Sequence, residues 1–133
     1  MRVAVDFAWR EVGAIRVEAG RLRFPEAPES PGVYRFDLGQ TVYIGEADRL
    51  RRRFQHYRTP GARQETNLRL NALMLHLLGE GGAVAVCAVT TASIEVDGRR
   101  SPLDFREKSA RLLVENAALT AAGMEGLRVE NLR

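Results

Sequence analysis

The sequence predicts an α+β domain in which a small, mainly antiparallel sheet is flanked by helices. Two short runs rich in β-branched and aromatic residues, 32–37 and 41–45, predict a hairpin because a glycine-containing turn separates them. A continuous apolar run at 83–90, preceded by the glycine-rich segment 79–82, is typical of a buried third strand. Helical spacing of apolar residues between these strands completes a pattern that favours the α+β class.

The amino-terminal residues add strands to these three core strands. Alternation of apolar and polar residues predicts one or two strands within residues 1–24. Three prolines between residues 25 and 31 then predict a stiff connector. We therefore divide the chain into an amino-terminal extension, 1–30, and a main domain, 31–133. The extension is expected either to lengthen the sheet at its edge or to contact another molecule.

Three helices are expected in the main domain. The first covers 48–58 and ends before Pro60, and the second covers 66–78 and is apolar on most faces, which predicts that it is well buried. The third is opened by Pro102, covers 102–122 and is closed by Gly123.

Composition excludes several classes of protein. No apolar run approaches the roughly 20 residues that a helix needs to cross a bilayer. The first residues lack the layout of a secretion signal, so we expect a cytoplasmic protein that does not engage a membrane. No spacing of cysteine and histidine predicts a zinc site, and the oligomeric state is left open.

Basic residues are concentrated in one segment. The net charge is only +3, but Lys108 is the single lysine among 20 basic residues. Between Arg49 and Arg69 there are seven arginines against one acid, Glu65. Such a surface suits a polyanion, because the guanidinium fork matches phosphate geometry. The alternative is a set of solvated helix faces in a protein that is generally rich in arginine.

Two tyrosines are expected on one face of the hairpin. With Leu38-Gly39 at the tip, Tyr34 lies directly opposite Tyr43, and opposed residues share a face. Val33 and its neighbours on the partner strand then point to the other side, which suits a core. The alternative is that the pair only stabilises the sheet.

The helix after the hairpin brings an arginine to the same place. Leu50, Phe54 and Tyr57 recur at helical spacing and form its buried stripe. Arg53 lies on the flank of that stripe and can lean over the sheet edge where the second tyrosine ends its strand, whereas Arg51 and Arg52 are expected to point to solvent.

A carboxylate interrupts the last helix. Leu112, Glu115 and Leu119 lie along one side, which predicts that the glutamate is within the core-facing stripe. A buried carboxylate without a partner costs several kcal/mol, so it needs a cation or hydrogen-bond donors. The two alternatives are a divalent metal, since carboxylates suit Mg²⁺ or Mn²⁺, and an ion pair with Arg111.

Taken together, these residues resemble the GIY-YIG nuclease family over about residues 31–131. The resemblance rests on Gly32-Val-Tyr34, Val42-Tyr-Ile-Gly45, Leu50, Arg53 and a glutamate, Glu115, in a late helix. The tyrosines are nine residues apart, and the arginine follows the second by ten. The string Tyr43-Ile-Gly-Glu-Ala-Asp-Arg-Leu-Arg-Arg-Arg53 is similar to the domain that makes the 3′ incision in bacterial nucleotide excision repair.

The resemblance implies a GIY-YIG-like fold, a metal-dependent DNA endonuclease and a role for each matching residue. Tyr34 and Tyr43 would position the attacking water and brace the phosphate, and Arg53 would bind the scissile phosphate. Glu115 would hold one divalent metal, Mg²⁺ or Mn²⁺. Further candidates are Tyr57 and its neighbour His56, the family asparagine at Asn131 with Asn116 as a rival, and the nucleic-acid-binding residues Arg49, Arg51, Arg52 and Arg58.

One residue departs from the excision-repair pattern. Glu46 stands where those relatives often have lysine, and it could repel the phosphate, add a metal ligand or favour the start of the helix. It supports an alternative function, a nucleic-acid-binding module with the same fold and no turnover. A third reading is an adaptor whose arginines meet an acidic protein. DNA is the expected partner, RNA is not excluded, and the substrate structure is left open between repair, recombination and restriction.

Overall fold

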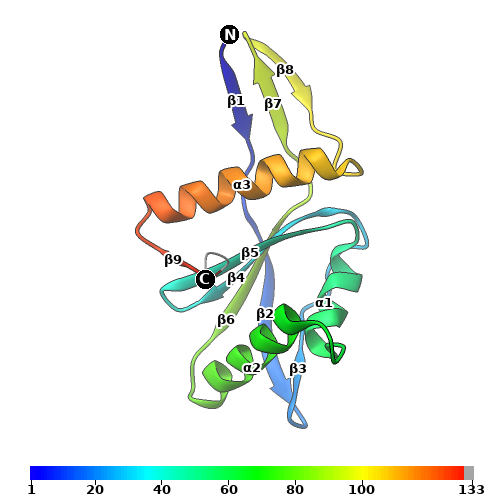
Figure 1. The fold of residues 1–133 in the computed structure, drawn as a ribbon, viewed down its shortest axis with the longest axis vertical. Helices are drawn as coiled ribbons and strands as arrows, with labels where there is room; N and C mark the ends of the chain where they lie inside the picture. The colour runs from blue at the N-terminus through cyan, green and yellow to red at the C-terminus, as the bar shows by residue number, and fades with distance from the viewer. Residues whose placement is uncertain (131–133) are drawn as a thin grey trace.

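The computed structural model describes residues 1–130, which form an α+β fold of three helices and nine strands (Figure 1). The strands are β1 (Val3–Asp6), β2 (Arg10–Glu18), β3 (Arg21–Arg23), β4 (Gly32–Leu38), β5 (Thr41–Ala47), β6 (Val84–Val89), β7 (Ser93–Val96), β8 (Arg99–Pro102) and β9 (Arg128–Val129). The helices are α1 (Leu50–Arg58), α2 (Glu65–Gly79) and α3 (Lys108–Met124). The expected α+β class and the first two helices are confirmed, with small shifts of their ends.

The main sheet has six strands in the order β3-β2-β6-β4-β5-β9. Every neighbouring pair is antiparallel except β5 and β9, which are parallel. The hairpin β4–β5 and the later strand β6 are the three expected core strands. β2 pairs with β6, so the extension lengthens the sheet. The amino-terminal residues form three strands rather than the expected one or two, and only β2 and β3 belong to the main sheet.

Helices cover both faces of the main sheet, α1 and α2 on one and α3 on the other (Figure 1). Tyr34 and Phe36 point toward α1 and α2, whereas Val33 and Ile44 point toward α3. The expectation of a core on the valine side alone is therefore incomplete, because the tyrosine side is a core as well. In α2 only Leu70 and Met74 are fully buried, so this helix is less buried than its composition predicts.

The register of the hairpin differs from the prediction by two residues. Gly39 and Gln40 form the tip, with Gly39 at a φ of 77°, so Tyr34 lies opposite Gly45 and Phe36 lies opposite Tyr43. A glycine readily adopts this positive φ, which lets β4 continue through Leu38 before the chain turns. Because side chains alternate with a period of two, the shift keeps both tyrosines on one face.

The segment before α3 is a second sheet rather than the start of a helix. Strands β1, β7 and β8 form a three-stranded antiparallel sheet that projects beyond α3, with the amino terminus at its tip (Figure 1). Pro102 belongs to β8, where it pairs with Ser93 of β7. The helix α3 therefore begins at Lys108, six residues later than expected. It also continues past Gly123 to Met124, because Gly126, with a φ of 81°, is the residue that allows the chain to turn.

In the part of the chain that the structure describes, no helix combines the length and the apolar character needed to span a bilayer.

A substitution at Gly45 tests how closely the tyrosine face packs. A Cβ atom at this position would overlap the Tyr34 ring and hydroxyl, so Gly45→Ala must displace a buried side chain. We expect a loss of about 1–3 kcal/mol in the free energy of unfolding, the usual cost of overpacking a core. Gly123→Ala is the control: its Cβ meets open space on α3, and it should be neutral or stabilise by up to about 1 kcal/mol. Equal stability of Gly45→Ala and the wild type in denaturant titrations would contradict this packing.

Candidate functional site

The candidate site lies at the edge of β5. β9 pairs with this strand only at Thr41 and Val42, so within the described residues the edge from Tyr43 to Ala47 faces no further strand. The ends of α1 and α3 flank this open edge from the two faces of the sheet (Figure 1). Side chains at such a strand edge can be reached by a ligand.

Three tyrosines cluster on the α1 side of this edge. The Tyr34 and Tyr57 hydroxyl oxygens are 2.6 Å apart and hydrogen-bonded, and both side chains are only 1% exposed. The Tyr43 ring is partly buried, and its centroid lies 6.3 Å from each of the other two. Tyr43 is therefore the phenol of the three that a ligand can reach most directly.

Burial keeps the two inner phenols neutral. It raises the pKa of Tyr34 and of Tyr57 far above the ordinary value, and the Tyr43 phenol raises both further, although the hydrogen bond with Tyr57 lowers the pKa of Tyr34 in part. Neither can act as a phenolate base near neutral pH. Both can donate or accept hydrogen bonds, which orients the hydroxyls of the cluster.

Arg53 lies among these phenols, on the predicted flank of α1. Its partial burial lowers the pKa of the guanidinium, but Tyr34, Tyr57, Glu46 and the third tyrosine together outweigh this and raise it. The residue is therefore a permanent, half-buried cation beside neutral donors. Such a group can bind one phosphate through its fork.

Glu115 reaches the same place from α3. Burial is the largest cause that raises the pKa of its carboxyl, and the nearby Glu46 carboxylate raises it further. Its carboxylate accepts a hydrogen bond from the Glu46 backbone, and its charge is also one of the causes that raise the pKa of Tyr34. The structure therefore brings Tyr34, Tyr43, Arg53 and Glu115 together at one edge, from four different elements.

The residues that were expected to form the buried stripe of α3 are not the ones that the structure buries. The buried residues of this helix are Ala110, Arg111, Val114, Ala118 and Ala122, whereas Leu112 is 38% exposed. Glu115 lies beside this stripe, at the margin of the core. Small alanines let α3 lie close to the sheet, and this explains why a leucine pattern did not locate the face.

Arg111 does not pair with Glu115, so that alternative is wrong. Its Nε donates to Glu46 at 2.7 Å, across the interface between α3 and β5. The Glu46 carboxylate, at the position that departs from the excision-repair pattern, is therefore engaged in an ion pair. Sequence reasoning missed it because the two residues are 65 positions apart, and the one available signal was an acid three residues after Tyr43 and an arginine one helical turn before Glu115.

The basic residues of α1 divide between two sides of the helix. Arg51 was expected to point to solvent, but it donates to the Ala27 carbonyl oxygen and pairs with acids of the connector, as does Arg49 with Glu29. The Glu29 pairing holds the pKa of that carboxyl below its usual range and raises the pKa of Arg49. Arg52 and Arg58 are exposed and form no ion pair with any other residue that the structure describes.

The remaining candidates lie around the site or outside the described residues. His56 is partly buried on α1, one helical turn after Arg53, and Asn116 is exposed on α3. Asn131 falls outside the described residues.

The donor set fits a singly held Mg²⁺ or Mn²⁺ rather than a structural zinc. Within residues 1–130 no three histidine, cysteine or acidic side chains are grouped to hold a metal. Mg²⁺ needs only one or two carboxylates, because water and substrate phosphates complete its shell. Glu115 supplies one such carboxylate, and a cation there would relieve the repulsion from Glu46 that disfavours its charged form.

A well-defined hollow lies elsewhere. A space of about 510 Å³ lies on the opposite flank of α1 and is lined by Arg23, Phe24, Arg51 and Arg58, among others. The open, shallow edge at Tyr43 suits an extended substrate backbone better than an enclosed small molecule.

The raised pKa of Glu115 predicts that this residue destabilises the metal-free protein. The fold disfavours the ionised carboxylate, so the penalty is present at pH 7 and disappears as pH falls through the raised pKa toward 4.5. Glu115→Gln should therefore raise the melting temperature at pH 7 by a few degrees, and this gain should shrink on acidification. Glu125→Gln, exposed at the end of α3, is the control and should change nothing. A lower melting temperature for Glu115→Gln at pH 7 would show that the carboxylate is already compensated.

Comparison of this chain with protein-family models, with curated proteins and with solved structures finds no match in any of the three.

Proposed function

We propose that this protein is a metal-dependent endonuclease of the GIY-YIG type that hydrolyses phosphodiester bonds in DNA. The observation that supports the proposal is the convergence of two motif tyrosines, Arg53 and Glu115 at the open edge of β5. Sheet stability alone gives no reason for a half-buried arginine and a half-buried glutamate both to lie near the buried phenol of Tyr34. Binding and cleavage of a phosphodiester would explain why these residues lie together.

Each residue has a role that its surroundings favour. Arg53 binds the scissile phosphate and offsets the negative charge that develops in the transition state. Tyr43, the accessible phenol, orients the attacking water. Tyr57 braces the Tyr43 hydroxyl from the core and is itself hydrogen-bonded to Tyr34, and both inner phenols stay neutral.

Hydrolysis adds the water oxygen to phosphorus and breaks the bond to the 3′ oxygen, which takes up a proton. The products are a 5′-phosphate and a 3′-hydroxyl. Glu115 would hold the divalent metal, which supplies charge stabilisation for the leaving oxygen when it is bound. The buried phenols are poor bases, so the proton of the water leaves to solvent or to a phosphate oxygen.

The alternative is a nucleic-acid-binding module without turnover, and the observation that favours it is Glu46. Its carboxylate lies beside Glu115 and acts on its pKa, so it could repel a phosphate. The ion pair with Arg111 weakens this objection, because it neutralises much of that charge.

Substitutions at the site test the proposal. Tyr43→Phe, Arg53→Ala and Glu115→Ala should each lower cleavage at least about 100-fold, the usual effect of removing a group that stabilises charge in the transition state. The measurement is cleavage of nicked, branched and plain duplex DNA and of RNA with Mg²⁺ or Mn²⁺, at a temperature where every variant is folded. Glu125→Ala is the control: this exposed residue directly follows α3, and the variant should cut normally. Wild-type activity in Glu115→Ala, or no cleavage of any substrate by the wild type, would refute the proposal.

Two neighbouring arginines test how DNA lies on α1. Arg52 is exposed and unpaired among the described residues, so it can neutralise a phosphate and release a counterion, whereas Arg51 is already paired with Glu26 and Glu29. Arg52→Ala should lower the slope of log affinity against log salt by about one, and Arg51→Ala by much less. The measurement is metal-free DNA binding over a range of salt concentrations. Equal effects of the two substitutions would mean that the connector releases Arg51 to the DNA.

A further inference from the structure

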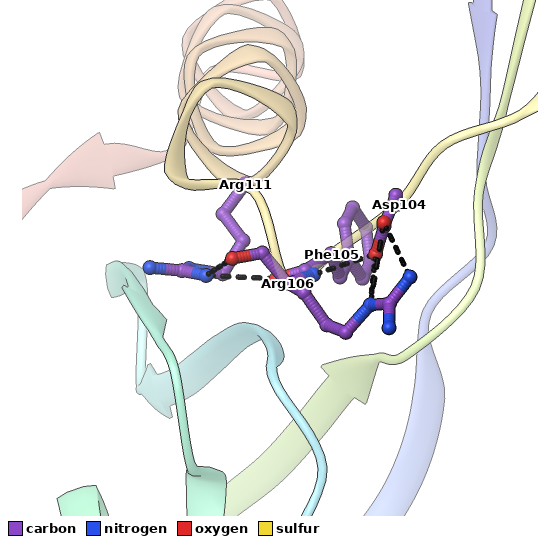
Figure 2. Close-up of polar contacts among 4 residues, drawn as sticks. All are labelled: Asp104, Phe105, Arg106 and Arg111. Atoms are coloured by element: carbon purple, nitrogen blue, oxygen red, sulfur yellow. Dashed lines mark hydrogen bonds and ion pairs between the residues drawn. The ribbon is translucent and has the colours of Figure 1, made fainter.

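Arg111 is a buried cation that the proposed reaction does not use. It is 6% exposed, and its guanidinium has three partners. Nε donates to the Glu46 carboxylate at 2.7 Å, and Nη1 donates to the carbonyl oxygens of Phe105 at 2.7 Å and of Arg106 at 3.2 Å. Figure 2 shows the side chain turning back from the first turn of α3 toward these two carbonyls.

The contacts connect three parts of the fold. The two carbonyls belong to the tight turn that leads into α3, where the Asp104 carboxylate accepts hydrogen bonds from the Arg106 backbone and side chain (Figure 2). Glu46 belongs to β5, at the open edge. Arg111 therefore connects the first turn of α3 to the turn that precedes the helix and to β5, the strand that carries Tyr43.

Glu46 meets α3 a second time through its backbone. Glu115 follows Arg111 by four residues, one helical turn, and its carboxylate accepts a hydrogen bond from the Glu46 backbone. One residue of β5 thus contacts two residues of α3, with its side chain at Arg111 and its main chain at Glu115. Two contacts a turn apart fix both the height and the rotation of the helix against the strand.

Burial makes this pair costly to break. The Arg111 and Glu46 side chains are only 8% and 14% exposed, and loss of one partner would leave the other charge buried without compensation. A buried ion pair contributes little net stability relative to apolar residues, so its value lies in the geometry that it enforces. Here that geometry includes the position of Glu115.

We propose that the Arg111–Glu46 ion pair is a positioning device that holds the Glu115 carboxylate at the β5 edge beside Tyr43. Its effect on cleavage rests on the proposed nuclease function, but its effect on the position of Glu115 does not. The pair also directs the Glu46 carboxylate to Arg111 of α3, and the guanidinium offsets much of its charge.

The test compares Arg111→Met, Arg111→Lys and Glu46→Gln with a matched control. Arg111→Met keeps the aliphatic stem, and Arg111→Lys keeps the charge without the fork that serves three acceptors. Arg69→Met is the control, because Arg69 forms another ion pair between distant elements, with the buried Glu130, and lies outside the proposed machinery. All measurements are made on the full chain at a temperature where each variant is folded.

The first readout needs neither metal nor activity. Amide hydrogen exchange at Glu46 reports the hydrogen bond to Glu115, and Glu115→Ala gives the reference for its loss. Arg111→Met should speed this exchange at least tenfold, close to Glu115→Ala, while a central amide such as that of Val86 keeps its rate. Arg111→Lys should restore part of the protection, and Arg69→Met should leave the Glu46 amide unchanged.

The second readout is metal binding and turnover. Arg111→Met should weaken binding of Mn²⁺ several-fold and lower kcat at least tenfold with KM within twofold, because DNA contacts are intact and Glu115 is misplaced. Glu46→Gln should have a smaller effect, since its amide oxygen still accepts from Arg111. Unchanged exchange at Glu46 in folded Arg111→Met, or unchanged Mn²⁺ affinity and kcat despite faster exchange, would overturn the proposal. Failure of the wild type to cut or to bind Mn²⁺ refutes the nuclease function instead, and the exchange rates still decide the positioning claim.

Discussion

The docking of α3 against β5 is the contact on which the rest of the structure depends. The tyrosines and Arg53 come from the hairpin and α1, which are neighbours in the chain, but Glu115 is supplied from a helix more than fifty residues later. Its place beside the phenols is fixed by small alanines packed on the sheet and by the two contacts that Glu46 makes with α3. Without that docking the edge would carry the aromatic residues, the arginine and Glu46, but it would lack the Glu115 carboxylate.

The same edge concentrates polar groups that the fold stabilises poorly. Burial disfavours the charged form of Glu115, and the adjacent Glu46 adds repulsion. Burial also holds Tyr34 and Tyr57 in their neutral forms. Such an arrangement is unfavourable for stability, and under the proposed function it is favourable for chemistry, because it pre-orients donors, a cation and the carboxylate that would hold the metal.

Local sequence patterns predicted much of the fold and part of the site. Turn glycines and apolar periodicity located the hairpin, α1, α2 and β6, and the period of two placed Tyr34 and Tyr43 on one face even though the register was shifted. They failed where tertiary contacts decide: the strands β7 and β8 are short and have no fully buried residue, and Pro102 is typical of a helix start although it ends a strand. The Arg111–Glu46 pair and the pairing of Arg51 with the connector were invisible for the same reason, since nothing local records a contact across the chain.

The most direct test of the account is to locate a metal ion in the protein. Crystals soaked in Mn²⁺ and examined by anomalous scattering should show a peak about 2.0–2.2 Å from a Glu115 carboxylate oxygen, on the side of the edge that carries Tyr43. Glu115→Gln crystals treated in the same way should lose that peak. A map with no manganese at Glu115, or a Glu115 carboxylate turned into solvent away from Tyr43, would contradict the central claim that this edge is built to hold an ion and a phosphodiester together.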